Sequence, residues 1–281
     1  MVTTAALPSS PQVMESTEAI HWPAKHDVFG VLVSATCYAE VVEKVLAAAR
    51  LGQSALVDFM PVHGLIPAVQ DPRHLARLNQ FDIVAPDGQP VRWALNYFYK
   101  TGLTDRVYGP ELTWRLCSAA AEAGVSIYLF GSTPAVLEKL QERLMTAFPA
   151  LRIAGAESPP FRPLTPEEDR AAVERINASG AGLLFLGTGS PRQEVFAFEH
   201  RDSIRAVQLC VGAAFDFHAG TKKIAPAWMQ KRGLEWLFRL TQEPGRLWKR
   251  YLVMNTTYVM LFVREALRPG RRRARAAATH G

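Results

Sequence analysis

The sequence of 281 residues contains few cysteines and no long apolar run. Cys37, Cys117 and Cys210 are far apart and form no CxxC or Cys/His cluster, which argues against a disulfide framework and a zinc site. Scattered thiols are typical of a reducing compartment. The longest apolar candidate, residues 252–263, contains Asn and Thr and is too short to cross a bilayer. Residues 1–25 lack the basic-then-apolar order of a secretory signal and are predicted to form a flexible leader.

Acidic residues are scarce in the C-terminal part of the chain. From Lys222 to the end, fourteen Lys and Arg residues stand against three Asp and Glu, whereas the rest of the chain is net negative. The same part contains several Trp and Tyr residues, which favour membrane interfaces. This combination predicts an anionic partner, namely phospholipid, nucleic acid or a phosphorylated substrate. An ordinary helix with a solvated charged face is the alternative.

The composition is that of a globular protein with a sizeable core, with 48% apolar and 21% charged residues. Short runs rich in Val, Ile, Leu and Phe alternate with amphipathic stretches, several of which begin with proline. This alternation predicts an α/β fold with a Rossmann-like, mostly parallel sheet flanked by helices, followed by a basic helical C-terminal appendage. The expected strands are residues 29–35, 55–59, 81–85, 125–130, 183–187 and 206–211. The expected helices are residues 38–51, 90–99, 110–123, 134–148, 166–179 and 191–200.

Ligands of such folds bind beyond the carboxyl ends of the strands, so the loops after strands carry the candidate site. Asp87, Gly88 and Gln89 lie between an expected strand and an expected helix. A carboxylate there can accept a proton from a hydroxyl nucleophile, and the glycine allows close approach to the backbone. The alternative for Asp87 is a helix N-cap, which is common at this position.

A second loop, residues 187–194, also joins a strand to a helix. Gly187 and Gly189 followed by a helix N-terminus at Pro191 can form a phosphate site, and a plain tight turn is the alternative. A dinucleotide fingerprint requires a third glycine, and Arg192 occupies its place.

Three further positions are candidates with structural alternatives. Gly131 and Ser132 follow a strand, where the serine can cap a helix or contact a nucleotide. Asp216 follows the last expected strand and can bind ribose or sugar hydroxyls, or cap a turn. His63 follows the second expected strand, and a lone histidine is more often a packed residue than a catalyst.

These loops and the C-terminal segment together resemble the WecG/TagA/CpsF glycosyltransferases, which are glycosyltransferase family 26. The resemblance covers residues 29–265 and rests on the joint order and spacing of several stretches. The stretches are residues 85–88 with Trp93, 106–112, 187–194, 212–216 with Gly220, 225–228, 233–240, and 242–244 with Arg246, Arg250 and Tyr251.

The resemblance implies an inverting transfer of a sugar from a UDP-sugar to a polyprenyl diphosphate-linked saccharide, without a required metal or other cofactor. The product would serve cell-surface polysaccharide synthesis. Asp87 matches the proposed general base of the family, and Gln193, next to Glu194, matches a glutamine near the donor. Arg239, Arg246 and Arg250 fall in an appendage that is thought to close over the active site and to hold the protein on the membrane.

Composition, charge and the resemblance together predict the organisation of the chain. We expect a flexible leader over 1–25, a catalytic α/β domain over 26–225, a helical appendage over 226–267 and a disordered basic tail over 268–281. The protein is expected to be cytoplasmic and peripheral on the inner face of the cell membrane, bound to its anionic surface and not to nucleic acid. The oligomeric state is left open.

The sequence departs from the family after the second strand. Many members carry a Thr-x-Asn segment near the donor sugar, whereas residues 59–64 here read Phe-Met-Pro-Val-His-Gly. His63 is therefore expected to supply polar contacts at that place. The competing predictions are a nucleotide-binding oxidoreductase and a noncatalytic protein that binds nucleotide or nucleic acid.

Overall fold

The computed structural model describes residues 19–268. Most of the expected leader and nearly all of the expected basic tail lie outside the described residues. All three cysteines lie within them and are free thiols.

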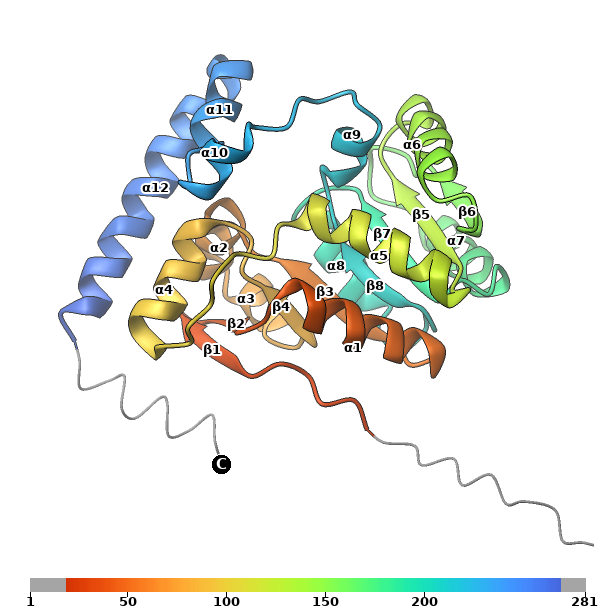
Figure 1. Cartoon of the computed structure of the whole chain (residues 1–281), viewed down its shortest axis with the longest axis horizontal. Helices are drawn as coiled ribbons and strands as arrows, with labels where there is room; N and C mark the ends of the chain where they lie inside the picture. The colour runs from red at the N-terminus through yellow and green to blue at the C-terminus, as the bar shows by residue number, and fades with distance from the viewer. Residues whose placement is uncertain (1–18, 269–281) are drawn as a thin grey trace, which may run out of the picture.

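The centre of the fold is a six-stranded sheet in which every pairing is parallel (Figure 1). The spatial order is β4-β3-β8-β7-β5-β6. Its inner strands are short apolar runs that are buried on both faces, as parallel strands covered by helices require. The strands are β3 (Ala55–Phe59), β4 (Ile83–Ala85), β5 (Ile127–Gly131), β6 (Ile153–Glu157), β7 (Leu183–Gly187) and β8 (Val207–Cys210).

Helices cover both faces of the sheet, and each face carries its own apolar cluster. Alternate residues of β3 enter opposite clusters: Val57 packs with the first and Leu56 with the second. The first face is covered by α1 (Tyr38–Arg50), α5 (Gly109–Ala123), α6 (Pro134–Ala147) and α9 (Ala214–His218). The second is covered by α2 (Val62–Gln70), α3 (Pro72–Leu78), α4 (Gln89–Tyr99), α7 (Pro166–Ala178) and α8 (Arg192–Glu199). The predicted α/β fold is confirmed.

One expected strand is wrong, and one strand of the sheet was not expected. The expected strand 29–35 is an antiparallel hairpin of β1 (Lys25–Val28) and β2 (Val31–Ser34), separate from the main sheet. Phe29 and Gly30 both have positive φ, which is the backbone of a tight two-residue hairpin turn. Strand β6 was not expected, because its sequence Ile-Ala-Gly-Ala-Glu contains only one large apolar residue.

Two glycines allow neighbouring strands and a helix to approach closely. Gly131 pairs with Gly187 across β5 and β7, and a Cβ on Gly131 would lie 2.4 Å from the Gly187 carbonyl carbon. A Cβ on Gly187 would lie 2.4 Å from the Phe215 ring. Both glycines are therefore required by packing at the end of the sheet.

Gly187→Ala is expected to lower the free energy of unfolding by about 1–3 kcal/mol, because the added methyl group overpacks a buried contact with Phe215. Urea denaturation measures this. Gly245→Ala is the control, since a Cβ there meets nothing within 4 Å. Equal destabilisation by both substitutions would contradict the packing role of Gly187.

The described part of the chain ends in three helices that we call the C-terminal appendage (residues 226–267). They are α10 (Ala227–Lys231), α11 (Glu235–Gln242) and α12 (Pro244–Ala266). Pro244 starts a new helix instead of continuing the previous one. Helix α12 runs alongside α2, and the Tyr258 hydroxyl donates to the Pro90 carbonyl at 2.6 Å (Figure 1).

Candidate active site

A cavity of about 1050 Å³ lies between the carboxyl ends of β3, β4 and β8 and the C-terminal appendage. Its walls come from loops far apart in the sequence and from α11 and α12. The following predicted site residues line it: His63, Asp87, Gly88, Gln89, Gly189, Gln193, Glu194, Arg239, Arg246 and Arg250. This is where the fold predicts a ligand.

Five predicted site residues are not among those that line this cavity. Gly131 and Gly187 are used for the close strand approach described above, and Ser132 donates its backbone N–H to the Gly187 carbonyl. Pro191 immediately precedes α8. Asp216 forms an ion pair with Lys222 at 3.4 Å and so holds a loop that does line the cavity.

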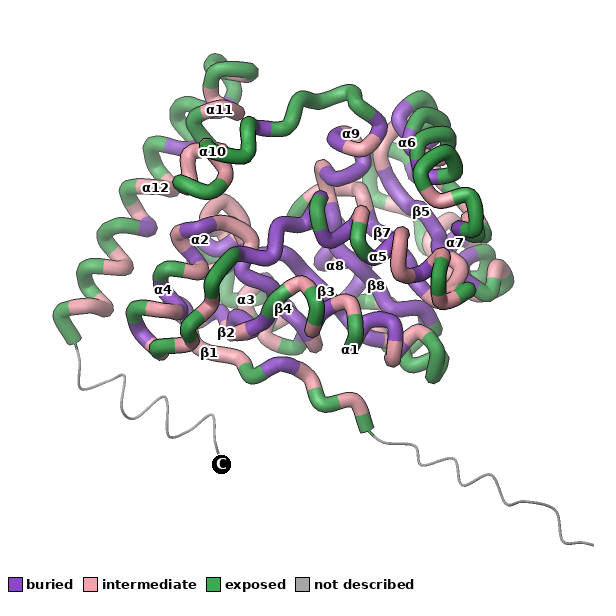
Figure 2. The backbone as a smooth tube through the Cα atoms, viewed as in Figure 1, coloured by how far each residue is buried: buried purple, intermediate pink, exposed green. Residues whose placement is uncertain are grey.

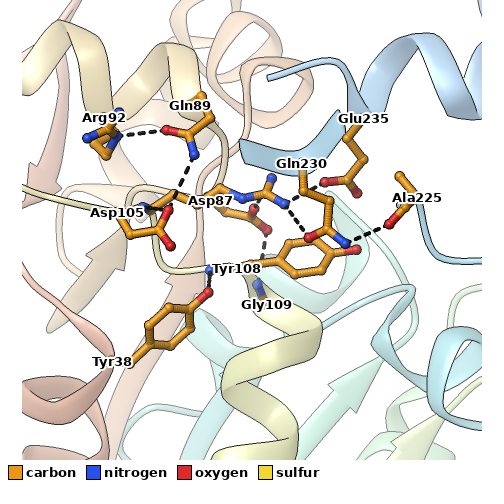
Figure 3. Close-up of polar contacts among 11 residues, drawn as sticks. Tyr38, Asp87, Gln89, Arg92, Asp105, Tyr108, Gly109, Ala225, Gln230 and Glu235 are labelled. Atoms are coloured by element: carbon orange, nitrogen blue, oxygen red, sulfur yellow. Dashed lines mark hydrogen bonds and ion pairs between the residues drawn. The ribbon is translucent and has the colours of Figure 1, made fainter. Parts of the chain in front are cut away.

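Asp87 lies in the loop between β4 and α4. The residue that caps α4 is Gly88, so the N-cap alternative for Asp87 is wrong. The φ angle of Gly88 is +122°, a backbone conformation that residues with a side chain rarely adopt. This explains why a glycine occupies the position. The Asp87 carboxylate instead accepts the Gly109 backbone N–H at 3.3 Å, at the N-terminus of α5, where the helix dipole favours a negative charge (Figure 3).

Arg106 links Asp87 to the C-terminal appendage. Its guanidinium lies 3.7 Å from the Asp87 carboxylate and 2.7 Å from Glu235 of α11, and it also donates to Gln230 at 3.1 Å. The guanidinium carbon of Arg106, Cζ, lies 4.2 Å from the centre of the Tyr108 ring. Glu235 and Gln230 approach from the appendage side in Figure 3. The appendage is therefore fixed over Asp87 by a buried ion pair.

The loop that carries Arg106 is itself held by polar contacts. Gln89 donates to the Asp105 carboxylate at 3.3 Å and accepts from Arg92 at 2.7 Å, and the Tyr38 hydroxyl accepts the Tyr108 N–H at 2.9 Å (Figure 3). The side chain of Gln89 is thus engaged by the scaffold, although the residue borders the cavity.

Burial raises the pKa of Asp87 to about 6, and the neighbouring Glu235 charge adds to the rise. Arg106, the Gly109 N–H and Arg239 oppose the rise. The side chain is 15% exposed and faces the cavity. At neutral pH it is therefore ionised and more basic than a free aspartate, which suits a general base.

The neighbours of Asp87 are expected to move the acid limb of the pH–activity profile in opposite directions. Arg106→Met removes a charge that lowers the pKa of Asp87, so the limb moves to higher pH. Glu235→Gln removes a charge that raises this pKa, so the limb moves to lower pH. The measurement is kcat/KM against pH for both variants. Shifts in the same direction would contradict this electrostatic account.

The appendage side of the cavity is cationic. Arg239 projects from α11 and Arg246 and Arg250 project from α12, and Lys222 and Lys223 lie on the preceding loop. The helix break at Glu243 means that the three arginines do not share one helix face, yet all three line the cavity.

Burial lowers the pKa of His63 to about 3, with Arg239 and Arg250 contributing, so His63 is neutral.

The sheet side of the cavity is acidic. Asp58 at β3 and Gln193 and Glu194 in the first turn of α8 form what we call the polar floor (Asp58, Gln193 and Glu194). The Gln193 amide donates to the Cys210 carbonyl at 3.1 Å. Within residues 19–268, no group of three or more His, Cys, Asp or Glu side chains is arranged to hold a metal ion.

Asp58, Arg106 and Glu235 were not identified as site residues from the sequence. Asp58 lies within the apolar run of a strand, and a single acidic residue there does not indicate a functional site. Arg106 belongs to the stretch 106–112 that carries the family resemblance, and this was the available signal. The Arg106–Glu235 contact spans 129 positions, and no local pattern indicates it.

The family comparison agrees with this geometry. The family model described as glycosyl transferase WecG/TagA/CpsF family matches residues 26–272, nearly the whole chain. The matched region includes the sheet, the cavity and the C-terminal appendage. The chain therefore belongs to the WecG/TagA/CpsF family of glycosyltransferases, enzymes of cell-surface polysaccharide synthesis.

Proposed function

We propose that this enzyme transfers a sugar from a UDP-sugar to a polyprenyl diphosphate-linked saccharide, with inversion at the anomeric carbon and without a required metal. The observation that carries the proposal is a basic carboxylate, Asp87, in the same cavity as a set of cationic side chains. A base and a site for diphosphate are the two things that a single displacement needs.

In the proposed reaction, Asp87 accepts the proton of an acceptor hydroxyl as its oxygen attacks C1 of the donor sugar. The bond between C1 and the diphosphate oxygen breaks as the new bond forms, and its electron pair leaves with UDP. Attack from the side opposite to UDP inverts the anomeric configuration. Arg106 keeps Asp87 oriented and ionised through the contact at 3.7 Å.

Negative charge grows on the departing diphosphate. Arg239, Arg246 and Arg250 supply guanidinium groups, which remain charged and pair with phosphate in a bidentate fork. Lys222 and Lys223 add two further positive charges at the same cavity. These side chains are the groups proposed to stabilise UDP as it leaves.

The test is a transfer assay with UDP-sugars and a short-chain polyprenyl diphosphate saccharide, followed by NMR of the product. We expect an inverted anomeric configuration and a rate that EDTA leaves unchanged. A retained configuration would contradict the single displacement, and loss of activity in EDTA restored by a divalent cation would contradict metal independence.

We further propose that the appendage lies on an anionic membrane surface at the inner face of the cell membrane. Among residues 19–268, none of the helices combines the length and apolar character needed to span a bilayer. Helix α12 exposes Trp248, Leu252, Val259 and Val263 at spacings of four and seven, which puts them on one face. Figure 2 shows exposed segments, in green, along the length of α12. Arg264 borders a hollow lined by apolar residues of this face. An apolar stripe with flanking cations is typical of a helix lying at a lipid interface.

The quadruple substitution Leu252→Ser, Val259→Ser, Val263→Ser and Leu267→Ser is expected to weaken binding to phosphatidylglycerol vesicles at least about tenfold, because it removes the apolar contact with lipid. Vesicle co-sedimentation measures this. The control is Leu51→Ser with Met145→Ser, two apolar residues of comparable exposure outside the appendage. Equal loss in both variants, or in neither, would contradict docking through α12.

A further inference from the structure

Two tryptophans of the cavity wall keep much of their surface uncovered. Trp93 of α4 is 45% exposed and Trp236 of α11 is 37% exposed, and both line the cavity that contains Asp87. Trp228 and Trp248 are exposed to a similar degree, 54% and 49%, but they are not among the residues that line it. Uncovered aromatic surface inside a functional cavity indicates a ligand that packs against it. We call Trp93 and Trp236 the aromatic wall.

Both indole rings of the aromatic wall are held by their neighbours. Gly233, with a φ of +71°, lies against Trp93, and a Cβ at this glycine would lie 3.2 Å from the ring atom Cη2. The Trp236 ring packs edge-to-face against Tyr251, with ring centroids 6.1 Å apart and ring planes at 71°. Tyr251 is buried and also lines the cavity. Rings that are already ordered lose little conformational freedom when a ligand packs on them, which favours binding.

The aromatic wall lies close to the proposed base. Trp93 follows Gln89 by four residues, so the two side chains share one face of α4, and Gln89 comes two residues after Asp87. Trp236 follows Glu235, whose carboxylate lies near enough to Asp87 to raise the pKa of that residue. One half of the wall therefore comes from the α/β domain and the other half from the C-terminal appendage.

The proposed reaction decides which ligand the aromatic wall takes. In a single displacement, the acceptor oxygen attacks C1 from the side opposite to UDP. The acceptor ring must therefore lie next to Asp87 and away from the departing diphosphate, which is proposed to lie with the arginines of α11 and α12. Glu235, the residue beside Trp236, is acidic and opposes a further anion, whereas it does not repel a neutral sugar.

A pyranose ring fits such a wall. Its faces carry C–H groups and no charge, so one face can pack on an indole ring while the hydroxyls at the ring edge remain free for polar contacts. Asn255 of α12 also lines the cavity, and its amide can both donate and accept hydrogen bonds. Aromatic faces combined with a few polar groups are typical of small-molecule sites.

We propose that Trp93 and Trp236 form an acceptor subsite, in which a neutral pyranose of the lipid-linked saccharide packs on the indole rings while its hydroxyl reaches Asp87. This rests on the proposed function, because it assumes that a sugar is transferred to a saccharide in this cavity. The appendage supplies Trp236, so the acceptor subsite is complete only when the appendage lies over the cavity.

The experiment compares two kinds of probe by calorimetric binding to the full-length protein in the presence of UDP. One is farnesyl diphosphate linked to N-acetylglucosamine, glucose or galactose, and the other is farnesyl diphosphate capped with a methyl group. The probes share the prenyl chain, the diphosphate and the charge, and they differ only in the sugar. Wild type is expected to bind at least one sugar probe about tenfold or more tightly than the methyl probe.

Trp93→Ala and Trp236→Ala are each expected to weaken binding of that sugar probe at least about tenfold, because each removes an aromatic anchor. Binding of UDP and of the methyl probe is expected to stay unchanged. Phenylalanine at either position is expected to restore most of the affinity, since it keeps an aromatic face, whereas leucine is not. The matched control is Trp228→Ala, which removes an exposed tryptophan of the appendage that does not line the cavity.

The outcomes separate this inference from the proposed function. Equal weakening of the sugar and methyl probes would assign the tryptophans to the lipid or the diphosphate, and weaker UDP binding would assign them to the uracil ring. Either result would overturn the inference alone, as would unchanged binding in both alanine variants, equal rescue by leucine, or a wild type that prefers no sugar probe. Failure of wild type to bind UDP and to transfer sugar to any lipid-linked saccharide would overturn the proposed function as well.

Discussion

Asp87→Asn is expected to lower kcat for sugar transfer by about 10²–10⁴-fold, the usual contribution of a general base. The substitution keeps the size of the side chain and removes its basicity. The contact with the Gly109 N–H can persist, since an amide oxygen also accepts a hydrogen bond. The Kd for UDP-sugar is expected to stay within a fewfold of wild type. The measurement is single-turnover transfer at saturating donor and acceptor.

A matched control is Asp202→Asn, which changes an exposed surface aspartate. A loss of less than about tenfold in Asp87→Asn would contradict the base role, because general-base contributions are larger. An equal loss in both variants would point to an effect on the protein as a whole.

Thermal unfolding separates loss of the base from loss of the fold. The pKa of Asp87 is raised to about 6 in the folded protein from an ordinary value near 3.8, so protonation favours the folded state. The contribution of Asp87 to the stability of wild type therefore falls as pH rises between these two values. Asp87→Asn has no carboxylate to bury in its ionised form. This variant is therefore expected to unfold at a higher temperature than wild type at pH 8, with a smaller difference at pH 4.5.

Replacing the arginines of the appendage is expected to have the second large effect. Single substitutions Arg239→Ala, Arg246→Ala and Arg250→Ala each remove a charge from the cavity, and the strongest of them is expected to lower kcat about 10²–10³-fold. Lysine at the same position is expected to restore part of the rate, because it keeps the charge and loses the bidentate fork.

Arg232→Ala is the control for these variants. Arg232 also belongs to the appendage, but it lies by the Trp228 ring and is not among the residues lining the cavity. Full activity of all three alanine variants would contradict a role for the appendage in stabilising the leaving diphosphate. A loss in Arg232→Ala equal to theirs would instead indicate a general effect of charge on the appendage.

Local sequence patterns predicted most of the central fold. Apolar runs such as Leu183–Gly187, flanked by amphipathic stretches, specify buried parallel strands and covering helices. The pattern failed where local geometry decided the outcome. The turn at Phe29 and Gly30 divides one expected strand into a hairpin, and the edge strand β6 has too few large apolar residues to be recognised.

The candidate site was predicted in part. Asp87, Gln193 and the three arginines reach one cavity, as the order of the loops and the family resemblance implied. Glycines that follow strands were ambiguous, because phosphate binding and close packing both require a missing side chain. Gly131 and Gly187 serve packing here, and only the neighbouring strand and Phe215 reveal it.

Contacts between distant segments were not predictable from local patterns. Glu235 meets Arg106 only because the appendage folds back over the sheet, and Asp58 becomes a site residue only because β3 ends at the cavity. Family membership removes the oxidoreductase and the noncatalytic binding protein as descriptions of the chain.

The most direct test is the pH dependence of single-turnover transfer by wild type and by Asp87→Asn. We expect the wild-type rate to fall below an apparent pKa of about 6, and the residual rate of Asp87→Asn to lack this acid limb. Burial also raises the pKa of Glu194 to about 6, so the variant identifies which carboxyl group is responsible for the acid limb. An unchanged acid limb in Asp87→Asn would contradict the assignment of Asp87 as the base.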